Sequence, residues 1–197
     1  MTRRSDITLE RARRAIFAAM LLFAVAACQP TGATTLMRMS LAQMSHAARL
    51  IVRGRCLAES MGWDAGEIWT FTSFQVEETW RGSAPSQISV RLLGGRVGNI
   101  TSAVSGVPRF SAGEEVVLFL ERTPRGDFSI VSWEQGTFRI RRDPRSGEDV
   151  AVQDTAAFPV FDPAMRRFEA TGIRDIPVAT LRSRVDAALR GDAGRQP

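Results

Sequence analysis

Residues 67–80 read EIWTFTSFQVEETW, and this stretch decides the fold class that the sequence predicts. A series of β-branched and apolar side chains from Ile68 to Val76 alternates with a second series from Trp69 to Gln75. Such a repeat of two residues places the two series on opposite faces of a β-strand, because successive side chains of a strand point in opposite directions. The stretch therefore predicts one long strand.

Shorter stretches with strand character flank it on both sides. Residues 116–120 (VVLFL) are apolar at every position, which indicates a central strand covered on both faces. Gly54 lies within the alternation of an early strand and predicts a β-bulge or a close approach of a neighbouring backbone. Glu134-Gln135-Gly136 is expected to be the turn of a hairpin. The predicted strands are 50–57, 67–80, 88–92, 116–120, 128–133, 137–141 and 150–152.

Two helices are expected at the two ends of this β region. The first is a short N-terminal helix over residues 36–48, with Thr35 as its N-cap. The second is a C-terminal amphipathic helix that has Asp175 as its cap and Pro177 in its first turn. It carries an apolar stripe and ends at Gly191, a residue type that often follows the last turn of a helix.

The predicted elements define the fold class. Short strands at this spacing, separated by turn residues, are typical of an all-β barrel or sandwich, and closing the sheet removes its exposed edges. We expect a β-barrel domain at 36–153, followed at 154–191 by an irregular segment and the C-terminal helix packed on the barrel, with a tail at 192–197. The irregular part is expected to be held to the barrel by its aromatic residues Phe158, Phe161 and Phe168.

The first 28 residues have the pattern of an export signal. Residues 1–14 hold five arginines and two acids, a net charge of +3, and thirteen apolar residues follow at 15–27. This run is shorter than the roughly 20 residues of a membrane-spanning helix, so it indicates a secretory signal. The signal ends with Val25-Ala26-Ala27-Cys28, which resembles the bacterial lipobox, and residues 29–35 would be a polar tether. The lipobox resemblance implies a lipid anchor at Cys28, and Gln29 favours sorting to the outer membrane. We thus expect an exported protein that is anchored in the periplasm or secreted.

Other interpretations of this segment stay open. Cleavage after Ala27 or Ala33 without lipidation is one, and a twin-arginine signal at Arg13-Arg14 is another. If Cys28 is not acylated, an oxidising periplasm could join Cys28 and Cys56 in a disulfide. If Cys28 is acylated, Cys56 is expected to be a buried small apolar residue.

Composition excludes several function classes. The chain has no Lys and a single His, so lysine Schiff-base chemistry, a P-loop and multi-histidine metal sites are excluded, and we expect neither a metal nor a cofactor. The formal net charge is +5, but removing residues 1–28 takes the arginines from 26 to 21 and the acids from 21 to 19, which leaves +2. With no nucleic-acid recognition motif either, the sequence argues against a nucleic-acid partner.

A long Gly-rich connection at 94–113 is the best candidate for a binding surface. Structureless loops of this length are uncommon inside a compact domain and are often functional. The residues of this loop that we expect to contact a partner are Arg96, Asn99, Arg109 and Phe110.

Carboxylate chemistry has weaker support. The pairs Glu77-Glu78 and Glu114-Glu115 are adjacent in predicted strands, so their side chains should point to opposite faces and read as solvated strand ends. No catalytic residue is therefore assigned. A carboxylate-based hydrolase stays open if the fold brings together Asp64, Glu67, Glu114 and Asp127.

The run 33–140 resembles a family of uncharacterised secreted bacterial proteins, through the stretches ATTLMRMSLAQM, RLIVRGRC, FTSFQVEETWRG, VRLLGGRVGNI, VPRFSAGEEVVLFL and EQGTFRI. The order of these stretches is also similar, more weakly, to the netrin/TIMP-like OB barrels. The second resemblance implies an OB-like or TIMP-like β-barrel. It further implies a metalloprotease inhibitor in which an N-terminal Cys28 chelates the protease zinc and Cys56 holds it by a disulfide. The chain departs from that family in having two cysteines instead of a dense disulfide set.

The sequence therefore favours an exported, lipid-anchored envelope protein that acts as a non-enzymatic protein- or peptide-binding module. Its expected partners are a protein or peptide, and the membrane through the lipid at Cys28. The TIMP-like inhibitor, the hydrolase and a purely structural assembly part are the alternatives.

Overall fold

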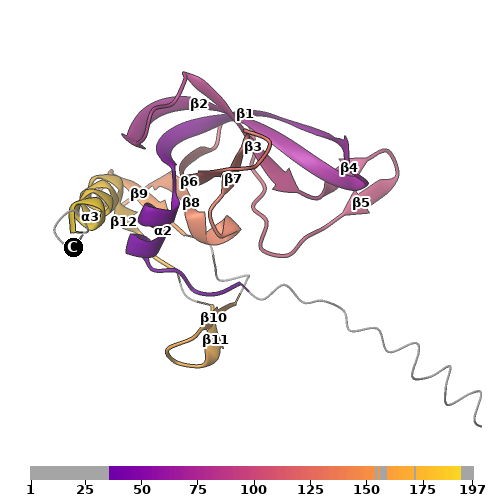
Figure 1. The fold of residues 1–197 in the computed structure, drawn as a ribbon. Coiled ribbons are helices and arrows are strands. Elements are labelled where there is room, and N and C mark those ends of the chain that lie inside the picture. Colours follow the sequence, from indigo (N-terminus) through magenta and orange to yellow (C-terminus); the bar gives the residue numbers. More distant parts are fainter. Residues whose placement is uncertain (1–35, 154, 156–158, 171, 192–197) are drawn as a thin grey trace, which may run out of the picture. The chain divides into compact units, whose positions relative to one another are not determined.

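The computed structural model describes residues 36–153, 155, 159–170 and 172–191. Within these residues the chain is mostly β-strand, with two α-helices, as the sequence predicts (Figure 1). The elements are α2 (Leu41–Ala47), β1 (Leu50–Asp64), β2 (Glu67–Arg81), β3 (Gln87–Leu93), β4 (Gly95–Val97), β5 (Ile100–Ser102), β6 (Glu115–Arg122), β7 (Phe128–Ile130), a 3-10 turn (Trp133–Gly136), β8 (Thr137–Arg142), β9 (Asp149–Val152), β10 (Val160–Asp162), β11 (Arg167–Glu169), β12 (Ile176–Pro177) and α3 (Val178–Gly191).

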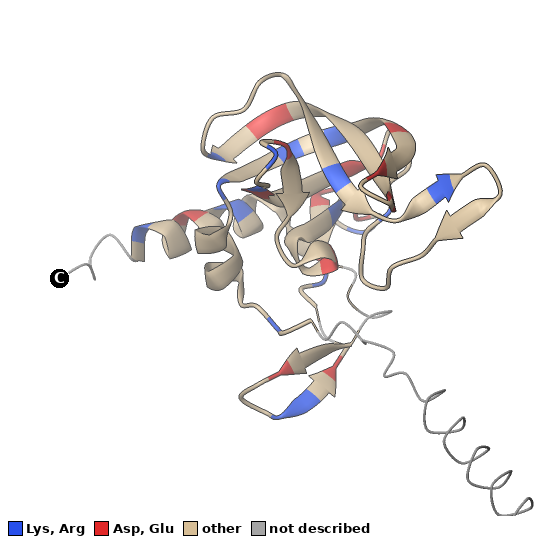
Figure 2. Ribbon diagram, turned by 45° about the vertical axis from the view of Figure 1, so that its right-hand side comes forward, with Lys and Arg blue, Asp and Glu red and all other residues tan. Residues whose placement is uncertain are grey.

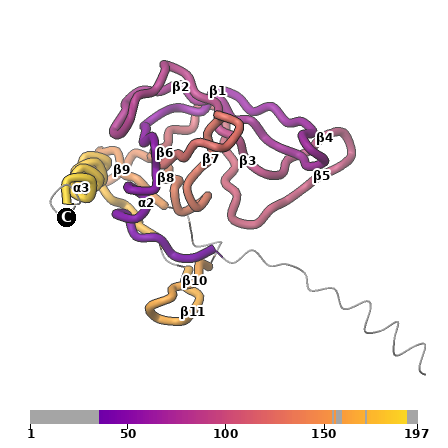
Figure 3. Tube along the Cα trace, viewed as in Figure 1, coloured from indigo at the N-terminus to yellow at the C-terminus, as the bar shows by residue number. Residues whose placement is uncertain are grey.

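One large mixed sheet contains most of the strands, in the order β1-β2-β3-β7-β6-β8-β9-β12. Its pairings are antiparallel except for β3 with β7, which are joined in parallel at Val90 and Phe128. β1 also pairs along β6, from Leu50 opposite Leu120 to Arg55 opposite Glu115. The pairings among β1, β2, β3, β7 and β6 therefore return to β1. Figure 3 shows the course of the chain through these strands.

β6 separates two apolar cores. Val116, Leu118 and Leu120 belong to the cluster that includes Phe74 of β2, and none of them is exposed to solvent. The alternate residues of β6 point into a second cluster, which the two helices cover. This arrangement confirms the prediction that 116–120 is a central strand covered on both faces, and it explains why every one of its positions is apolar.

The segment after β6 differs from the predicted hairpin. β7 and β8 do not pair with each other; each pairs with a different half of β6, and the 3-10 turn Trp133–Gly136 joins them. Ser132 and Trp133 have positive φ values, of 50° and 53°, so both adopt the left-handed backbone conformation. No sequence pattern predicts this turn.

The first helix is shorter than predicted. α2 begins after Ser40, whose side chain accepts a hydrogen bond from Gln43 N, while the Gln43 side chain accepts one from Ser40 N. This capping box satisfies two backbone donors and sets the start of the helix at Leu41. Residues 36–40 are extended instead of helical, and the predicted cap Thr35 lies outside the described residues.

The C-terminal helix also starts later than predicted. Ile176 and Pro177 pair with β9 as β12, so Pro177 precedes the helix and Asp175 does not cap it. α3 packs against α2, and its stripe residues Leu181 and Val185 are fully buried. The burial confirms the predicted apolar stripe.

Two segments expected to be irregular contain small hairpins. β4 and β5 pair inside the Gly-rich connection 94–113, and β10 and β11 pair inside 154–172. Phe161 and Phe168 contact each other, with ring centres 5.4 Å apart, but Phe168 is 59% exposed and does not hold the segment to the sheet. Phe158 lies outside the described residues.

Candidate functional site

The outer face of β2 and β3 carries an aromatic and cationic cluster. Phe71 of β2 lies opposite Arg91 of β3, and Trp69 lies opposite Leu93. The guanidinium carbon of Arg91 is 3.8 Å from the centre of the Trp69 ring and 5.6 Å from that of Phe71. A guanidinium over an indole face is a favourable cation–π contact. Arg91 is only 7% exposed, so the cluster holds its geometry before any partner arrives.

Two turns close over this cluster. Arg91 Nη2 donates a hydrogen bond to Asp64 at the end of β1, and Arg91 Nη1 lies 3.7 Å from Asp127 Oδ2 in the β6–β7 turn. Asp64 also accepts a hydrogen bond from Arg125 of that turn. The two arginines and two aspartates balance in charge and tie the β1–β2 turn to the β6–β7 turn.

A pocket of about 310 Å³ opens beside the cluster, with more apolar than polar surface. In the part of the chain that the structure describes, the indole N–H of Trp69 is buried and donates to no partner. A buried donor without an acceptor costs about 1–3 kcal/mol, so a ligand carbonyl that reached this N–H would relieve a cost already present. The pocket is lined by Trp69, Arg91, Thr123, Pro124, Arg125 and Ser129.

The four residues predicted on the Gly-rich connection divide into two pairs. Arg96 of β4 and Asn99 in the β4–β5 turn are exposed. Arg109 instead donates to Thr70 Oγ1 at 2.8 Å and to the Leu93 carbonyl at 3.4 Å, and so fastens the base of the hairpin.

Phe110 is 6% exposed and belongs to the core. Its ring meets the Phe74 ring edge-on, with centres 5.0 Å apart. Phe110 is therefore not a surface contact, and we keep only Arg96 and Asn99 as candidate contacts from this connection. A Gly-rich stretch signals loops but does not show which of its side chains turn inward.

The four acids of the hydrolase alternative do not all converge, although Asp64 lies opposite Glu67 where β1 and β2 meet. Asp64 and Asp127 share Arg91, but Glu114 lies apart, bound to Arg139 and accepting from Ser111 N at 2.9 Å. Glu67 is exposed at the start of β2. In the described residues, no group of three His, Cys, Asp or Glu is placed to hold a metal ion.

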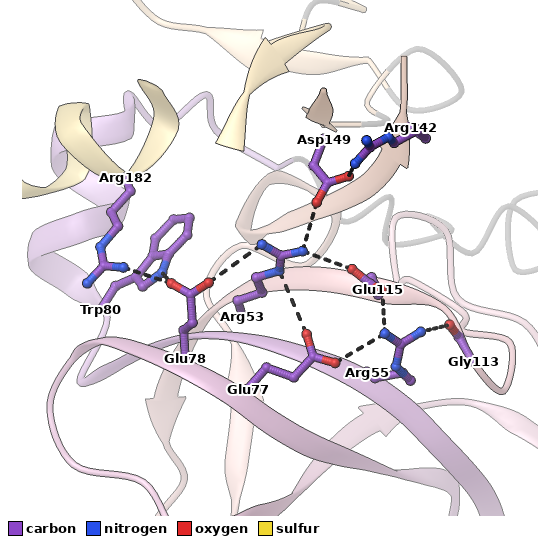
Figure 4. A network of polar contacts seen from close by, with 10 residues as sticks. All are labelled: Arg53, Arg55, Glu77, Glu78, Trp80, Gly113, Glu115, Arg142, Asp149 and Arg182. Atoms are coloured by element: carbon purple, nitrogen blue, oxygen red, sulfur yellow. Dashed lines mark hydrogen bonds and ion pairs between the residues drawn. The ribbon is translucent and has the colours of Figure 1, made fainter. Parts of the chain in front are cut away.

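A second polar cluster was missed by sequence reasoning. Figure 4 shows the Arg53 guanidinium surrounded by four carboxylates: Glu115 at 3.1 Å, Asp149 at 3.0 Å, Glu78 at 3.5 Å and Glu77 at 3.7 Å. These acids come from β2, β6 and β9. Arg53 on β1 therefore joins three further strands.

The expectation that Glu77 and Glu78 point to opposite faces as solvated strand ends is wrong. The register of β1 and β2 shifts after Arg53, where Glu78 is opposite Arg53 but Val76 is opposite Gly54. Glu77 is the extra residue of this β-bulge, and a bulge breaks the strict alternation of side chains. The prediction at Gly54 is confirmed in this form: the β2 backbone approaches Gly54 closely, and the bulge itself lies on β2 opposite it. Gly54 was the sequence signal that could have revealed the cluster.

Arginines around the rim complete the network. Arg55 lies 3.3 Å from Glu77, Arg182 of α3 donates to Glu78 at 2.8 Å, and Arg142 donates to Asp149 at 3.3 Å. In Figure 2, basic and acidic segments lie next to one another along the strands, as these pairs require.

The network shifts two pKa values. Burial alone would lower the pKa of Arg53, but the hydrogen bonds to Glu115 and Asp149 outweigh it and the pKa is raised. The pKa of Asp149 is lowered, chiefly by the hydrogen bond from Arg142 and then by that from Arg53. A cleft of about 480 Å³ borders this network. The charged groups of the network are already paired with one another. We therefore assign the network the structural role of holding α3 and β9 against β1 and β2.

Of the two cysteines, only Cys56 lies among the described residues. Cys28 lies outside the described residues, so neither its lipid anchor nor a disulfide with Cys56 is tested. Cys56 is 1% exposed, and burial first, then the nearby Glu59 and Glu114, raise the pKa of its thiol. Among the described residues, the helices are too short or too polar to span a bilayer.

Comparison with known proteins does not assign the chain to a family. The chain matches no protein-family model and no curated protein.

Proposed function

We propose that this protein is an exported, lipid-anchored envelope protein that binds a peptide segment of a partner without catalysing a reaction. The observation that carries the binding proposal is Trp69, which lines an apolar pocket while its indole N–H has no acceptor among the described residues. A peptide offers backbone carbonyls that can accept from the Trp69 N–H, together with apolar side chains that can fill the pocket.

We further propose that β1, β2, β3, β7 and β6 form an OB-like barrel. Its support is the circuit of strand pairings, with β1 bonded to both β2 and β6, together with the parallel contact of β3 and β7. In an OB barrel, ligands bind on the face of the second and third strands, between two turns. The Trp69–Arg91 cluster lies on the corresponding strands.

Charge suggests which peptides fit. Arg125 at the pocket rim is half exposed and shares Asp64 with Arg91, so an acidic group on the peptide can take the place of Asp64 beside Arg125. Pro124 and the Trp69 ring offer apolar surface next to it. The expected ligand is a short peptide with an apolar residue beside an acidic one.

The buried donor sets a condition on binding. The Trp69 N–H is covered in the unbound protein, so the turn that contains Thr123 to Asp127 must shift for a ligand carbonyl to reach it. Ligand binding is therefore expected to break the contact between Arg125 and Asp64 first, since these exposed charges are held only weakly in water.

A displayed library of random peptides, selected on the purified protein, tests the proposal. Selected peptides should bind the wild type at least about tenfold more tightly than Trp69→Phe, which keeps an aromatic ring but has no N–H donor. Trp63→Phe is the matched control, because Trp63 is 52% exposed and does not line the pocket. Selected peptides that bind Trp69→Phe as tightly as the wild type would refute the assignment of this pocket.

A further inference from the structure

A small three-stranded sheet stands at the start of the described chain. Phe161 N donates to the Leu36 carbonyl and Arg38 N donates to the Phe161 carbonyl, both at 2.8 Å, so Leu36–Arg38 runs parallel to β10. On its other side β10 pairs with β11, with Phe161 opposite Phe168. Figure 1 shows the β10–β11 hairpin projecting from the rest of this unit.

The polarity of this sheet is inverted. Met37, Phe161 and Phe168 are paired across the three strands and so share one face, on which Met37 is 58% and Phe168 is 59% exposed. The charged residues take the alternate positions: Arg38 Nη1 donates to Asp162 Oδ2 at 2.7 Å and to Glu169 Oε2 at 3.3 Å.

The carboxylates on the charged face are better covered than the apolar side chains, while Arg38 stays 47% exposed. Asp162 is 6% exposed, and its pKa is lowered, first by the hydrogen bond from Arg38. A sheet in water normally turns its apolar side chains inward and its charges outward. The reverse arrangement indicates that the Met37–Phe161–Phe168 face meets an apolar environment other than the core of this chain.

The turn next to this face carries one exposed arginine, Arg166. The β10–β11 turn holds Met165, which is 57% exposed, followed by the exposed residues Arg166 and Arg167. Arg167 is opposite Asp162 and pairs with Glu169, so it belongs to the charged face, whereas Arg166 forms no ion pair within the described residues. Apolar side chains beside arginines match the boundary between acyl chains and anionic headgroups.

We infer that this face, comprising Met37, Phe161 and Phe168, docks on a phospholipid bilayer together with Met165 of the adjoining turn. The inference rests on the proposed lipid anchor at Cys28. Eight residue steps separate Cys28 from Leu36, which span at most about 29 Å even when fully extended. An acylated Cys28 therefore keeps this sheet within about 29 Å of its lipid. One acyl signal is strengthened by a second membrane contact of this kind.

An environment-sensitive dye on Phe168→Cys tests the inference in the full chain, reconstituted in protein-free vesicles of phosphatidylethanolamine and phosphatidylglycerol. The same dye on Asn99→Cys is the control, because Asn99 is also exposed but lies on the β4–β5 hairpin. Lipid-soluble quenchers should reduce the signal at position 168 at least about threefold more than at position 99. Circular dichroism checks that both labelled chains stay folded.

Flotation and the mass of the acylated N-terminus separate the two claims. A wild-type chain that neither floats nor carries an acyl mass would overturn the anchor. A chain that floats while position 168 is quenched no more than position 99 would overturn the docking face alone. The Cys28→Ser chain should still show quenching at position 168 when vesicles are in excess, and Met165→Ser in that chain should weaken it. A dye response that needs added envelope proteins would assign the face to a protein partner and contradict the bilayer.

Discussion

The Arg91 guanidinium carbon lies 3.8 Å from the centre of the Trp69 indole ring, on the outer face of β2 and β3. Asp64 holds this guanidinium from the end of β1. Arg91 can therefore not turn away from the indole without losing an ion pair, so the ring is fixed in place before binding. A fixed aromatic surface lowers the ordering cost of binding, which is the physical reason for placing the ligand here.

Replacing Trp69 should separate binding from stability. Trp69→Phe loses some ring contact but also removes a buried donor that costs about 1–3 kcal/mol, so the two changes offset. The free energy of unfolding, measured with urea, should change by less than about 1 kcal/mol. A loss similar to the roughly 3–5 kcal/mol expected for Phe74→Ala in the core would show that the indole N–H is satisfied.

Arg91 should be needed for the fold of this face. Arg91→Met leaves Asp127 without Arg91 and Asp64 with Arg125 alone, and should lower the free energy of unfolding by about 1–3 kcal/mol. Arg96→Met makes the same change at an exposed position of β4, where an effect within about 0.5 kcal/mol is expected. Equal effects of the two substitutions would contradict the conclusion that Arg91 ties the β1–β2 turn to the β6–β7 turn.

Phe110 and Asn99 should behave differently, although both lie on the same Gly-rich connection. Phe110→Ala removes a ring from the core beside Phe74 and should destabilise the protein by about 3–5 kcal/mol. Asn99→Ala, in the exposed turn, should stay within about 0.5 kcal/mol. Thermal unfolding of the two variants checks the division of these residues into packing and surface.

Acid should weaken the Arg53 network. The pKa of Asp149 is lowered in the folded protein, so its stabilising contribution is present above the ordinary aspartate pKa of about 4 and is lost as the pH falls through the lowered value. Asp143 and Asp162 have lowered pKa values too and add to the same loss. Urea midpoints of the wild type and Asp149→Asn should converge as the pH drops below about 4. A constant gap at all pH values would show that Asp149 is not held by the arginines.

Cys56 should be inert in the folded chain. It is 1% exposed and burial raises the pKa of its thiol, so little reactive thiolate is available. In a Cys28→Ser chain, a thiol reagent should react at the rate of unfolding and become fast in urea. Rapid labelling under native conditions would place Cys56 at the surface.

Local patterns predicted most strands of the large sheet because side-chain alternation is local, although β1 continues to Asp64, beyond the predicted 50–57. The repeat of two in 67–80 and the unbroken apolar run 116–120 correspond to β2 and β6 within a residue or two. The first helix was predicted too long because Met37 and Met39 look equally apolar in a helix or in the extended arm that Gln135 holds, with Gln135 Oε1 accepting from Met39 N at 2.9 Å.

Long-range pairing was beyond the sequence. The prediction of a hairpin at Glu134-Gln135-Gly136 is wrong because β7 and β8 each pair with β6 instead of with each other. This pairing depends on contacts between residues distant in the chain. The same limit applies to the candidate site. Trp69 was placed on the correct face of its strand, but Arg91 and the β6–β7 turn meet it only through the strand order β2-β3-β7-β6.

The indole N–H signal of Trp69 in a two-dimensional NMR spectrum tests the central claim most directly. Its assignment follows from the peak that disappears in Trp69→Phe. On titration with a selected peptide, this signal should move downfield as the N–H donates to a ligand carbonyl, while the signals of Trp63, Trp80 and Trp133 stay in place. A peptide that binds and leaves the Trp69 signal unmoved would contradict the proposed site.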